Sequence, residues 1–458
     1  MDTAPAQQHR RSPAELHAAA RTHYIWPQLT REEVHGGKPQ LLAEGEGVRV
    51  RTVDGTEYLD LMSTVSRASA LGYGQERIAQ AVYEQLGRLH YGGTAASQAD
   101  VTIELAARIA ELAPGRLTAS AFVGSGSEAN DVAFKLAHFY HHARGLKPRA
   151  FKVISRWNDY HGASGGAMAA SDWLGVRRPA EPGVPGFSRI PGPVAYGPNV
   201  LNLEADVWNA SCAEFLEEQI LHEGPELVSA FILEPIAQAN GVQLPPVDYL
   251  RRVQEICRRH DVLLIADEVI TGFGRTGAWF SLDHWGIEPD IMTMAKALTG
   301  GYIPLGAVIV SDEIRDTIPA FQDIHTYGGH PAGAVAALEA IAIYEEEGLV
   351  ERAATEGAHL LESLRRLEEL DAVGEVRGLG LWAAVDFTSD RESRAPLAPD
   401  RLEAIVRRTR ELGVLVSQNG RAIEVAPPLV IERRDLDEGV ARFEQAVRET
   451  CAADGAQP

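Results

Sequence analysis

Cysteine is scarce in this chain, and the few that occur show no motif spacing. Cys212, Cys257 and Cys451 are the only three among 458 residues, and no two of them form a C-x-x-C pair. A disulfide scaffold needs more cysteine, and a cysteine-based zinc module needs paired spacing. The sequence therefore excludes both classes and is typical of a protein from a reducing compartment.

Long apolar runs and positive charge are lacking as well. No stretch approaches 18 uninterrupted apolar residues, so no membrane-spanning helix is predicted. The first 26 residues are polar and contain no apolar run of signal-peptide length. Lysine and arginine number 43 against 64 aspartate and glutamate, which gives a net charge of −21 and argues against nucleic-acid or anionic membrane partners. We therefore expect a cytoplasmic enzyme.

Short apolar runs alternate with helical patterns from about residue 75 onward. Strands are predicted at 121–123, 151–154, 229–233, 262–266, 291–295 and 307–310, and helices at 127–142, 247–260, 332–346 and 351–370. Short and almost wholly apolar strands suit a sheet that is covered on both faces. The alternation predicts an α/β fold with a doubly wound, mainly parallel sheet.

Three further segments depart from this alternation. Residues 41–61 predict a β-hairpin with its turn at Asp54-Gly55, and the Pro- and Gly-rich residues 175–200 predict a long ordered loop. After about residue 372 the pattern changes to isolated strands and helices. We expect a large domain with a smaller α/β domain built from both chain ends, divided as 1–70, 71–335 and 336–458.

The segment VGSGSEAN at 123–130 follows one of the predicted strands. Its glycines, including Gly126, allow a sharp turn, and Ser127 begins a helix whose free N–H groups can bind an anion such as phosphate. The same letters match G-x-G-x-x-A, a loose dinucleotide signature that needs an acidic residue about 20 positions later. Ser155 and Arg156 stand at the end of the next strand instead, so that fit is poor. A turn without a ligand remains an alternative.

A second motif places carboxylates at a strand exit. The apolar run at 262–266 leads into Asp267 and Glu268, and a glycine-rich loop follows at once. A carboxylate at such a point is partly desolvated and needs a cation, a metal ion or a protonated heterocycle as its partner. The alternatives are a helix cap and a salt bridge with Arg275.

Lys296 stands among apolar neighbours in DIMTMAKALTGG at 290–301. It follows a predicted strand and precedes Gly300 and Gly301. Apolar surroundings lower the pKa of a lysine, and the neutral amine can form a Schiff base. A lysine that snorkels at a strand end is the commoner role for one seen in isolation.

Tyr160 and His161 precede Gly162 near the end of another predicted strand. An aromatic ring there can stack on a planar ligand, or it can belong to the core. Together, the anion cradle, the carboxylate, the ring and the isolated lysine are the groups needed to bind pyridoxal phosphate (PLP). The helix N-terminus takes the phosphate, the carboxylate keeps the pyridine nitrogen protonated, and the lysine carries the aldehyde as an imine.

The same segments resemble those of the class III aminotransferases, a group of PLP enzymes of fold type I that includes the ω-amino acid and amine transaminases. The matching stretches cover about residues 120–331 in the order and spacing of that family: SGSEAN, YHG, ILEPIAQANGV, LLIADEVITGFGRTG, PDIMTMAKAL and HTYGGHP. The resemblance implies PLP as the cofactor. It also implies a homodimer, or a tetramer of dimers, with active sites shared between subunits.

The resemblance implies catalytic roles for Lys296 and Asp267. Lys296 would be the Schiff-base lysine and proton carrier, and Asp267 would pair with the pyridinium nitrogen. Val269 would pack against one face of the ring and Tyr160 against the other. Glu234, in ILEP, would lie near the hydroxyl side of the cofactor.

The resemblance also implies how the phosphate is bound. Gly126 and Ser127 would bind it within one subunit. Thr326, in HTYGGHP, would reach the phosphate of the neighbouring subunit.

Two segments depart from the family pattern and both concern the substrate pocket. Members that use amines commonly have a Gly-Leu-Trp segment after the hairpin, whereas residues 59–74 contain no Trp and place Arg67 nearby. Many relatives have an arginine where this chain has Ser417, but Arg421 matches a second arginine of the diaminopelargonate synthase branch. Arg67 and Arg421 are therefore candidates to bind a substrate carboxylate. The alternative for Arg67 is a side chain that faces solvent, and the alternative for Arg421 is a structural ion pair. Trp26 is a weaker candidate for the pocket.

The expected reaction is ping-pong transfer of an amino group from an amine or ω-amino acid to pyruvate or 2-oxoglutarate. Amino acid racemisation and an aminomutase reaction are alternatives within the family. A nucleotide-dependent oxidoreductase and a non-catalytic binding protein fit the residues less well. No metal is expected, because His138 and His142 have no Glu between them in an H-E-x-x-H pattern.

Overall fold

The centre of the molecule is a seven-stranded sheet. The computed structural model describes residues 11–194, 196–197, 199, 201, 203–239 and 241–452. The sheet has the order β4-β10-β9-β8-β7-β5-β6; β10 pairs antiparallel with β4 and β9, and the other neighbouring strands pair parallel. Its strands are β4 (Leu117–Val123), β5 (Lys152–Arg156), β6 (Phe187–Ile190), β7 (Val228–Leu233), β8 (Leu263–Asp267), β9 (Ile291–Met294) and β10 (Gly306–Ser311). The six strands predicted from the sequence are confirmed, with differences at their ends.

Helices cover this sheet on both faces. The helices of this part of the chain are α3 (Glu76–Arg88), α4 (Asp100–Leu112), α5 (Gly126–Arg144), α6 (Gly165–Ala170), α7 (Leu174–Arg177), α8 (Ala205–Glu223), α9 (Tyr249–Arg259), α10 (Asp312–Thr317) and α11 (Pro331–Glu346). Of these, α4, α5, α6, α8, α9 and α10 contact strands of the sheet. Because side chains alternate along a strand, Phe231 belongs to one apolar cluster and Ile232 to the other. Burial on both faces explains why the strands are nearly continuous apolar runs.

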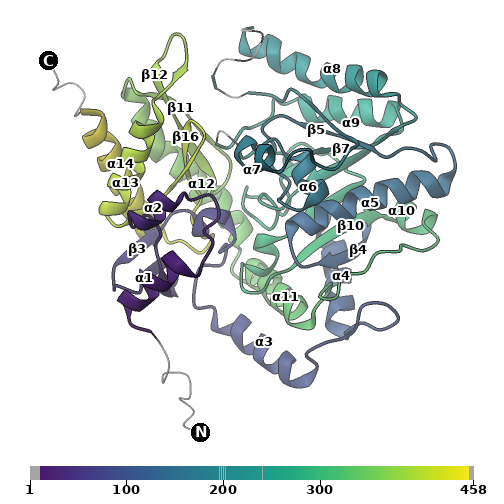
Figure 1. Cartoon of the computed structure of the whole chain (residues 1–458), viewed down its shortest axis with the longest axis horizontal. Helices are drawn as coiled ribbons and strands as arrows, with labels where there is room; N and C mark the ends of the chain where they lie inside the picture. Colours follow the sequence, from purple (N-terminus) through teal and green to yellow (C-terminus); the bar gives the residue numbers. More distant parts are fainter. Residues whose placement is uncertain are drawn as a thin grey trace.

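A four-stranded sheet joins the two ends of the chain. It contains β1 (Leu42–Glu46), β2 (Arg49–Thr52), β3 (Glu57–Asp60) and β14 (Val414–Leu415), and β14 pairs parallel with β3. The predicted hairpin is confirmed as β2–β3, with Gly55 at a φ of +86° in its turn. In Figure 1 these first strands, in purple, lie beside the yellow-green C-terminal elements.

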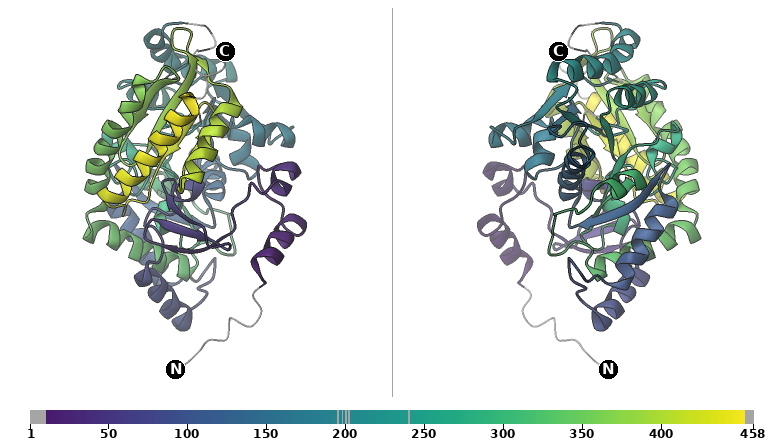
Figure 2. Two further views of the ribbon diagram at one scale, coloured as in Figure 1. Left: turned by 90° about the vertical axis from the view of Figure 1, so that its left-hand side faces the viewer. Right: turned by 90° about the vertical axis from the view of Figure 1, so that its right-hand side faces the viewer.

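The C-terminal part contains a second antiparallel sheet. Its strands are β11 (Val373–Gly378), β12 (Ala383–Asp390), β13 (Ala395–Pro396), β15 (Ser417–Asn419) and β16 (Ala422–Val425), and its helices are α12 (Leu349–Arg365), α13 (Pro399–Glu411) and α14 (Arg433–Ala452). The two N-terminal helices, α1 (Pro13–Thr22) and α2 (Arg31–His35), lie at the margin of the molecule (Figure 2). The remaining helical turns are η1 (Ser63–Arg67), η2 (Arg178–Ala180), η3 (Ser281–His284), η4 (Lys296–Thr299) and η5 (Arg366–Glu369).

The predicted loop over 175–200 is wrong in part, because Phe187–Ile190 forms strand β6 and pairs with β5 at the sheet edge. This segment has no continuous apolar run, so only the pairing with β5 makes it a strand. Within the described ranges, no helix combines the length and apolarity needed to cross a bilayer.

Arg275 connects the large domain to the C-terminal elements. Its side chain is only 1% exposed, and Nη1 donates to the carbonyl oxygens of Leu381 at 3.0 Å and Pro427 at 2.6 Å. Nη2 donates to Ser63 Oγ at 3.2 Å. The alternative prediction of a salt bridge between Arg275 and the carboxylates at the end of β8 is therefore wrong. Arg275 satisfies carbonyl groups that would otherwise be buried without partners.

Arg275→Met should lower the free energy of unfolding by about 3 kcal/mol, because it leaves two buried carbonyl oxygens without donors. Arg434→Met is a matched control, since Arg434 is 81% exposed and its loss should change the stability by about 0.5 kcal/mol or less. Denaturant unfolding of both variants measures the difference. Equal stabilities would show that Arg275 does not hold the two parts together.

Candidate active site

A cavity of about 180 Å³ lies at the carboxyl ends of the parallel strands. In open α/β sheets this edge is where ligands bind, because loops from several strands converge there. The cavity is lined by Gly126, Ser127, Tyr160, His161, Gly162, Glu234, Asp267, Val269, Ile270, Ala295 and Lys296. The structure thus brings together seven of the eight residues predicted to contact the cofactor, all except Thr326.

Asp267 is held in place by three hydrogen bonds. Oδ2 accepts from Asn130 Nδ2 at 2.8 Å and lies 2.8 Å from Nδ1 of His161, while Oδ1 accepts from the backbone N–H of Val269 at 3.1 Å. Asn130 is oriented in turn, because its Oδ1 accepts from Thr293 Oγ1 at 2.8 Å. These contacts fix a buried carboxylate at the cavity wall.

Asn130 and His161 are functional positions to which the sequence reasoning assigned no role. Both occur in motifs that were recognised, at the end of SGSEAN and in YHG. The signal that could have identified them is their polarity at positions that are buried: Asn130 is 1% and His161 2% exposed. Buried polar side chains require partners, and here the shared partner is Asp267.

Lys296 begins the short turn η4 directly after β9. Its φ of 46° is unusual for a residue with a side chain, and strained backbone of this kind occurs at functional sites. Among the described residues, nothing accepts a hydrogen bond from its Nζ. Burial and, to a smaller extent, the positive charge of Arg67 lower the pKa of Lys296 to about 8, against the opposite effects of Asp267 and Glu234.

Glu234 also lines the cavity and directly follows β7. Burial raises its pKa well above the ordinary value, and the carboxylates of Asp159 and Asp267 add to the effect. Its Oε1 accepts from the backbone N–H of Tyr160 at 2.8 Å. The neighbouring loop is fixed by the buried pair of Arg156 and Asp159, whose Nε and Oδ2 are 2.8 Å apart.

The N-terminus of α5 lines the cavity through Gly126 and Ser127. Gly126 approaches Val269 so closely that an added Cβ would lie 2.9 Å from Val269 Cγ1. Ser127 Oγ accepts from the N–H of Ala163 at 3.2 Å. Because the first N–H groups of a helix have no partners within it, this end of the cavity favours an anionic group. Tyr160 and Val269 line the same cavity as the lysine and this helix end.

Thr326 and Trp26 do not line the cavity within this chain. Thr326 is exposed in the turn before α11, and its carbonyl oxygen accepts from the hydroxyl of Tyr91 at 3.0 Å. Trp26 is partly buried in the N-terminal segment, and its Nε1 donates to the carbonyl oxygen of Ala20 at 2.9 Å. Their predicted roles in the site therefore stay predictions.

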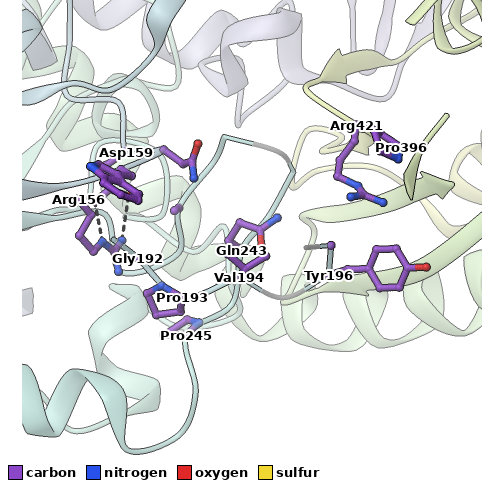
Figure 3. Close-up of a pocket in the computed structure, with 14 residues that line it drawn as sticks. Arg156, Asp159, Gly192, Pro193, Val194, Tyr196, Gln243, Pro245, Pro396 and Arg421 are labelled. Atoms are coloured by element: carbon purple, nitrogen blue, oxygen red, sulfur yellow. Dashed lines mark hydrogen bonds and ion pairs between the residues drawn. The ribbon is translucent and has the colours of Figure 1, made fainter. Parts of the chain in front are cut away.

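Arg421 lines a different cavity, of about 310 Å³. Its Nε donates to Oδ1 of Asp386 at 2.5 Å, and its guanidinium lies 5.1 Å from the ring centre of Tyr196. Figure 3 shows Arg421 on the side of this cavity opposite Arg156 and Asp159. Arg421 thus forms an ion pair with Asp386, which was the alternative prediction for this residue. Binding of a substrate carboxylate by Arg421 stays a prediction.

Arg67 is buried, not solvent-facing. It is 8% exposed, and Nη2 donates to Glu424 while Nη1 donates to Oε1 of Gln238 at 3.0 Å. The alternative of a solvent-facing Arg67 is therefore wrong. For metal ions, the described part of the chain contains no group of three or more His, Cys, Asp or Glu side chains placed to bind one.

Comparisons with known proteins agree with this geometry. A family model described as aminotransferase class-III matches residues 33–447. The chain is 34% identical to the putrescine–pyruvate aminotransferase of Pseudomonas aeruginosa, covering 96% of this chain and 97% of that protein. It is 35% identical to the taurine–pyruvate aminotransferase of Rhodobacter capsulatus, covering 96% of this chain and 98% of that protein.

Solved structures show the same relationship. An (S)-enantioselective ω-transaminase from Thermomicrobium roseum superposes with a TM-score of 0.91 at 37% identity, covering 96% of this chain and all of that chain. The residues of the cavity fit PLP, since it is lined by a fixed carboxylate, a helix N-terminus and a lysine amine that has no hydrogen-bond acceptor within the part of the chain that the structure describes. The chain therefore belongs to the class III aminotransferases: it is a PLP-dependent enzyme of fold type I that moves an amino group from an amine to a keto acid.

Proposed function

We propose that this aminotransferase uses pyruvate as its amino acceptor and that Lys296 and Asp267 are its central catalytic residues. Three kinds of relative support pyruvate, since their names are putrescine–pyruvate, taurine–pyruvate and hypotaurine/taurine–pyruvate aminotransferase. A primary amine or ω-amino acid would be the donor. The observation that carries the assignment of residues is the buried Lys296 amine, which has no acceptor among the described residues and opens into the cavity that contains Asp267.

PLP, when bound, supplies an electron sink that stabilises negative charge on the substrate carbon. Lys296 would hold the cofactor covalently, and Asp267 would face the ring nitrogen and favour its protonated form. Tyr160 and Val269 would contact the two faces of the ring. The N–H groups at Gly126 and Ser127 would bind the phosphate.

Lys296 is suited to move a proton at the substrate carbon. With a pKa of about 8, a useful fraction of the amine is neutral near pH 7.5, so that it can accept a proton and return it. Asp267 keeps a fixed position because Asn130 and His161 both bind its Oδ2. Glu234, whose pKa is raised, can be protonated and donate a hydrogen bond to an oxygen on its side of the cavity.

Capture of PLP by the apoenzyme should depend on pH through Lys296. Only the neutral amine attacks an aldehyde, so the capture rate should rise about tenfold per pH unit below the pKa of about 8 and level off above it. Stopped-flow absorbance measures this rate, and Lys296→Ala serves as the control without capture. A midpoint near the ordinary lysine pKa of 10.5 would contradict the proposed environment.

The loaded enzyme should convert to its amino form when taurine or putrescine is added without a keto acid, and pyruvate should restore the original absorbance. Alanine should appear in an amount equal to the pyruvate consumed. Lys296→Ala should lower turnover roughly a thousandfold, while the surface variant Lys38→Ala should not change it. Amino group movement that needs no keto acid would favour the racemase or aminomutase alternative.

We also propose a homodimer with shared active sites. Large apolar side chains are exposed on and near α3 and α4 and in the segment before α11: Tyr83, Leu86, Tyr91, Ile103, Ile324 and Tyr327. Exposed apolar clusters of this kind support a protein interface. Thr326 lies within this region, which supports the proposal that it contacts the cofactor of the neighbouring subunit. A tetramer of dimers is compatible with the same interface.

Subunit complementation tests this arrangement. Thr326→Ala should weaken PLP binding about tenfold, although Thr326 does not line the cavity of its own chain. At a PLP concentration too low to load Thr326→Ala, mixing Thr326→Ala protomers with inactive Lys296→Ala protomers, followed by dissociation and reassociation, should raise the activity above that of either variant alone. The mixed dimer would contain one site with both native residues. Reassociated dimers without regained activity would contradict the shared site.

We further propose a cytoplasmic location and a two-domain organisation. Cys212, Cys257 and Cys451 are all free thiols, which supports a reducing compartment. The parallel pairing of β14 with β3 supports a small domain made of residues 1–70 and 336–458, with residues 71–335 as the large domain. Because α11 packs against α3 and α4, its residues up to 346 are better included in the large domain.

A further inference from the structure

A second cavity, of about 310 Å³, lies between the large domain and the C-terminal elements. Arg156 and Asp159 line it from the large domain, and Pro396 and Arg421 line it from the C-terminal elements. Figure 3 shows these two pairs on opposite sides of the cavity. Among the described residues, none that lines this cavity also lines the cofactor cavity. It is therefore a separate space, with a volume in the range of small-molecule sites.

Arg421 uses only part of its guanidinium group. Nε donates to Oδ1 of Asp386 at 2.5 Å, and Nη2 donates to the carbonyl oxygen of Arg394 at 3.0 Å. Nη1 has no acceptor within the part of the chain that the structure describes. Gly197, which also lines the cavity, has a φ of 116°, and an added Cβ there would lie 2.6 Å from Nη1. The missing side chain thus leaves space beside a donor without a partner.

The ring of Tyr196 brings a second guanidinium group to the same place. Its centre lies 5.1 Å from the guanidinium carbon of Arg421 and 5.6 Å from that of Arg394. Gly374 packs closely against this ring, since an added Cβ there would lie 2.4 Å from it. Arg394 has no carboxylate partner in the described ranges. Because like charges repel, two guanidinium groups this close to one ring favour an anion beside them.

The neighbouring carboxylates do not balance this charge. Asp386 is shared, since its Oδ1 accepts from Arg421 and its Oδ2 accepts from Arg377 Nη2 at 3.0 Å. Glu375 pairs with Arg377 at 2.9 Å. The group therefore has three positive and two negative side chains: Arg377, Arg394, Arg421, Asp386 and Glu375. Asp386 is fully buried and the side chain of Arg421 is 12% exposed, so an anionic ligand would stabilise the excess positive charge.

We propose that this cavity is a second ligand site, in which Arg421 and Arg394 bind the oxyanion group of a small organic molecule, a carboxylate or a phosphate. A guanidinium group presents paired N–H donors that match two oxygens of such a group. Asp386 holds Arg421 through Nε and leaves Nη1 for the ligand. A ligand in this cavity would contact both the large domain and the C-terminal elements. The site is independent of which amine and which keto acid the enzyme uses.

A wall of the large domain separates this site from the cofactor cavity. Asp159 lines the second cavity, and its Oδ2 accepts from the backbone N–H of Glu234 at 3.2 Å. Glu234 lines the cofactor cavity, and its Oε1 accepts from the backbone N–H of Tyr160, the residue next to Asp159. A ligand beside Arg421 therefore lies behind this wall and should not compete with pyruvate.

Calorimetric titration of the PLP-loaded enzyme tests the site with two probes, inorganic phosphate and succinate. The loaded enzyme is used because the cofactor then occupies the anion site at the N-terminus of α5. At least one of the two probes should bind once per chain, and chloride at equal ionic strength should not replace it. The probe that binds identifies the ligand group as phosphate or carboxylate.

Arg421→Gln and Arg394→Gln should each weaken this binding about tenfold, because each removes charge-assisted hydrogen bonds. Arg421→Gln should still fold, since Arg377 continues to pair with Asp386. Gly197→Ala removes no charge but fills the space beside Nη1 of Arg421, so it should weaken the binding as well.

Arg391→Gln is the matched control. Arg391 is exposed on the same turn as Arg394, and its Nη2 donates to the carbonyl oxygens of Glu368 and Leu370. Its replacement should leave the affinity for phosphate and succinate unchanged.

The inference is overturned if neither probe binds, or if Arg421→Gln and Arg394→Gln bind the probes as tightly as the wild type does. It is also overturned if the bound probe inhibits by pure competition with pyruvate, because the cavity would then belong to the path of the substrate. The calorimetric result stands even if the enzyme does not use pyruvate, so that a failure of the proposed function is distinguishable from a failure of this site.

Discussion

Burying a lysine amine and a carboxylate in one small cavity is the constraint on which this structure depends. The free energy cost of desolvating each group is large unless partners compensate it. For Asp267, hydrogen bonds with Asn130 and His161 offset this desolvation cost. Lys296 receives no internal hydrogen bond among the described residues, and its pKa falls to about 8 instead. The cavity is therefore prepared for a ligand that bonds to the amine and presents a positive group to the carboxylate.

The sheet explains why these groups meet. Because five neighbouring strands run parallel, their carboxyl ends form one edge, and β7, β8 and β9 place Glu234, Asp267 and Lys296 there. The crossover helices bury both faces of the sheet and keep the strand ends rigid. The C-terminal elements approach the same edge, where Arg275 joins them to the large domain and Glu424 pairs with Arg67.

Much of this arrangement could be predicted from the sequence. The apolar strands are fixed by local composition, and Lys296, Asp267 and Gly126 follow them in motifs whose chemistry is specific. Strand β6 could not be predicted, because its residues become a strand only by pairing with β5. The structure rules out the solvent-facing alternative for Arg67, because this side chain is buried and paired with Glu424.

Pairings between distant segments were the information that the sequence could not supply. Arg421 has the right spacing for a carboxylate ligand, yet its guanidinium is paired with Asp386, which is 35 residues away along the chain. Glu424 carries no motif, and only folding brings it to Arg67 across 357 residues. Side-chain partners of this kind depend on how the domains pack, so they follow from the tertiary structure alone.

The most direct measurement of the central claim is the site of covalent cofactor attachment. The loaded enzyme would be treated with borohydride, which fixes the cofactor to the amine that holds it, and the digested protein would be mapped by mass spectrometry. We expect a single modified peptide with the cofactor on Lys296. Modification of another lysine, or of none in an active enzyme, would contradict it.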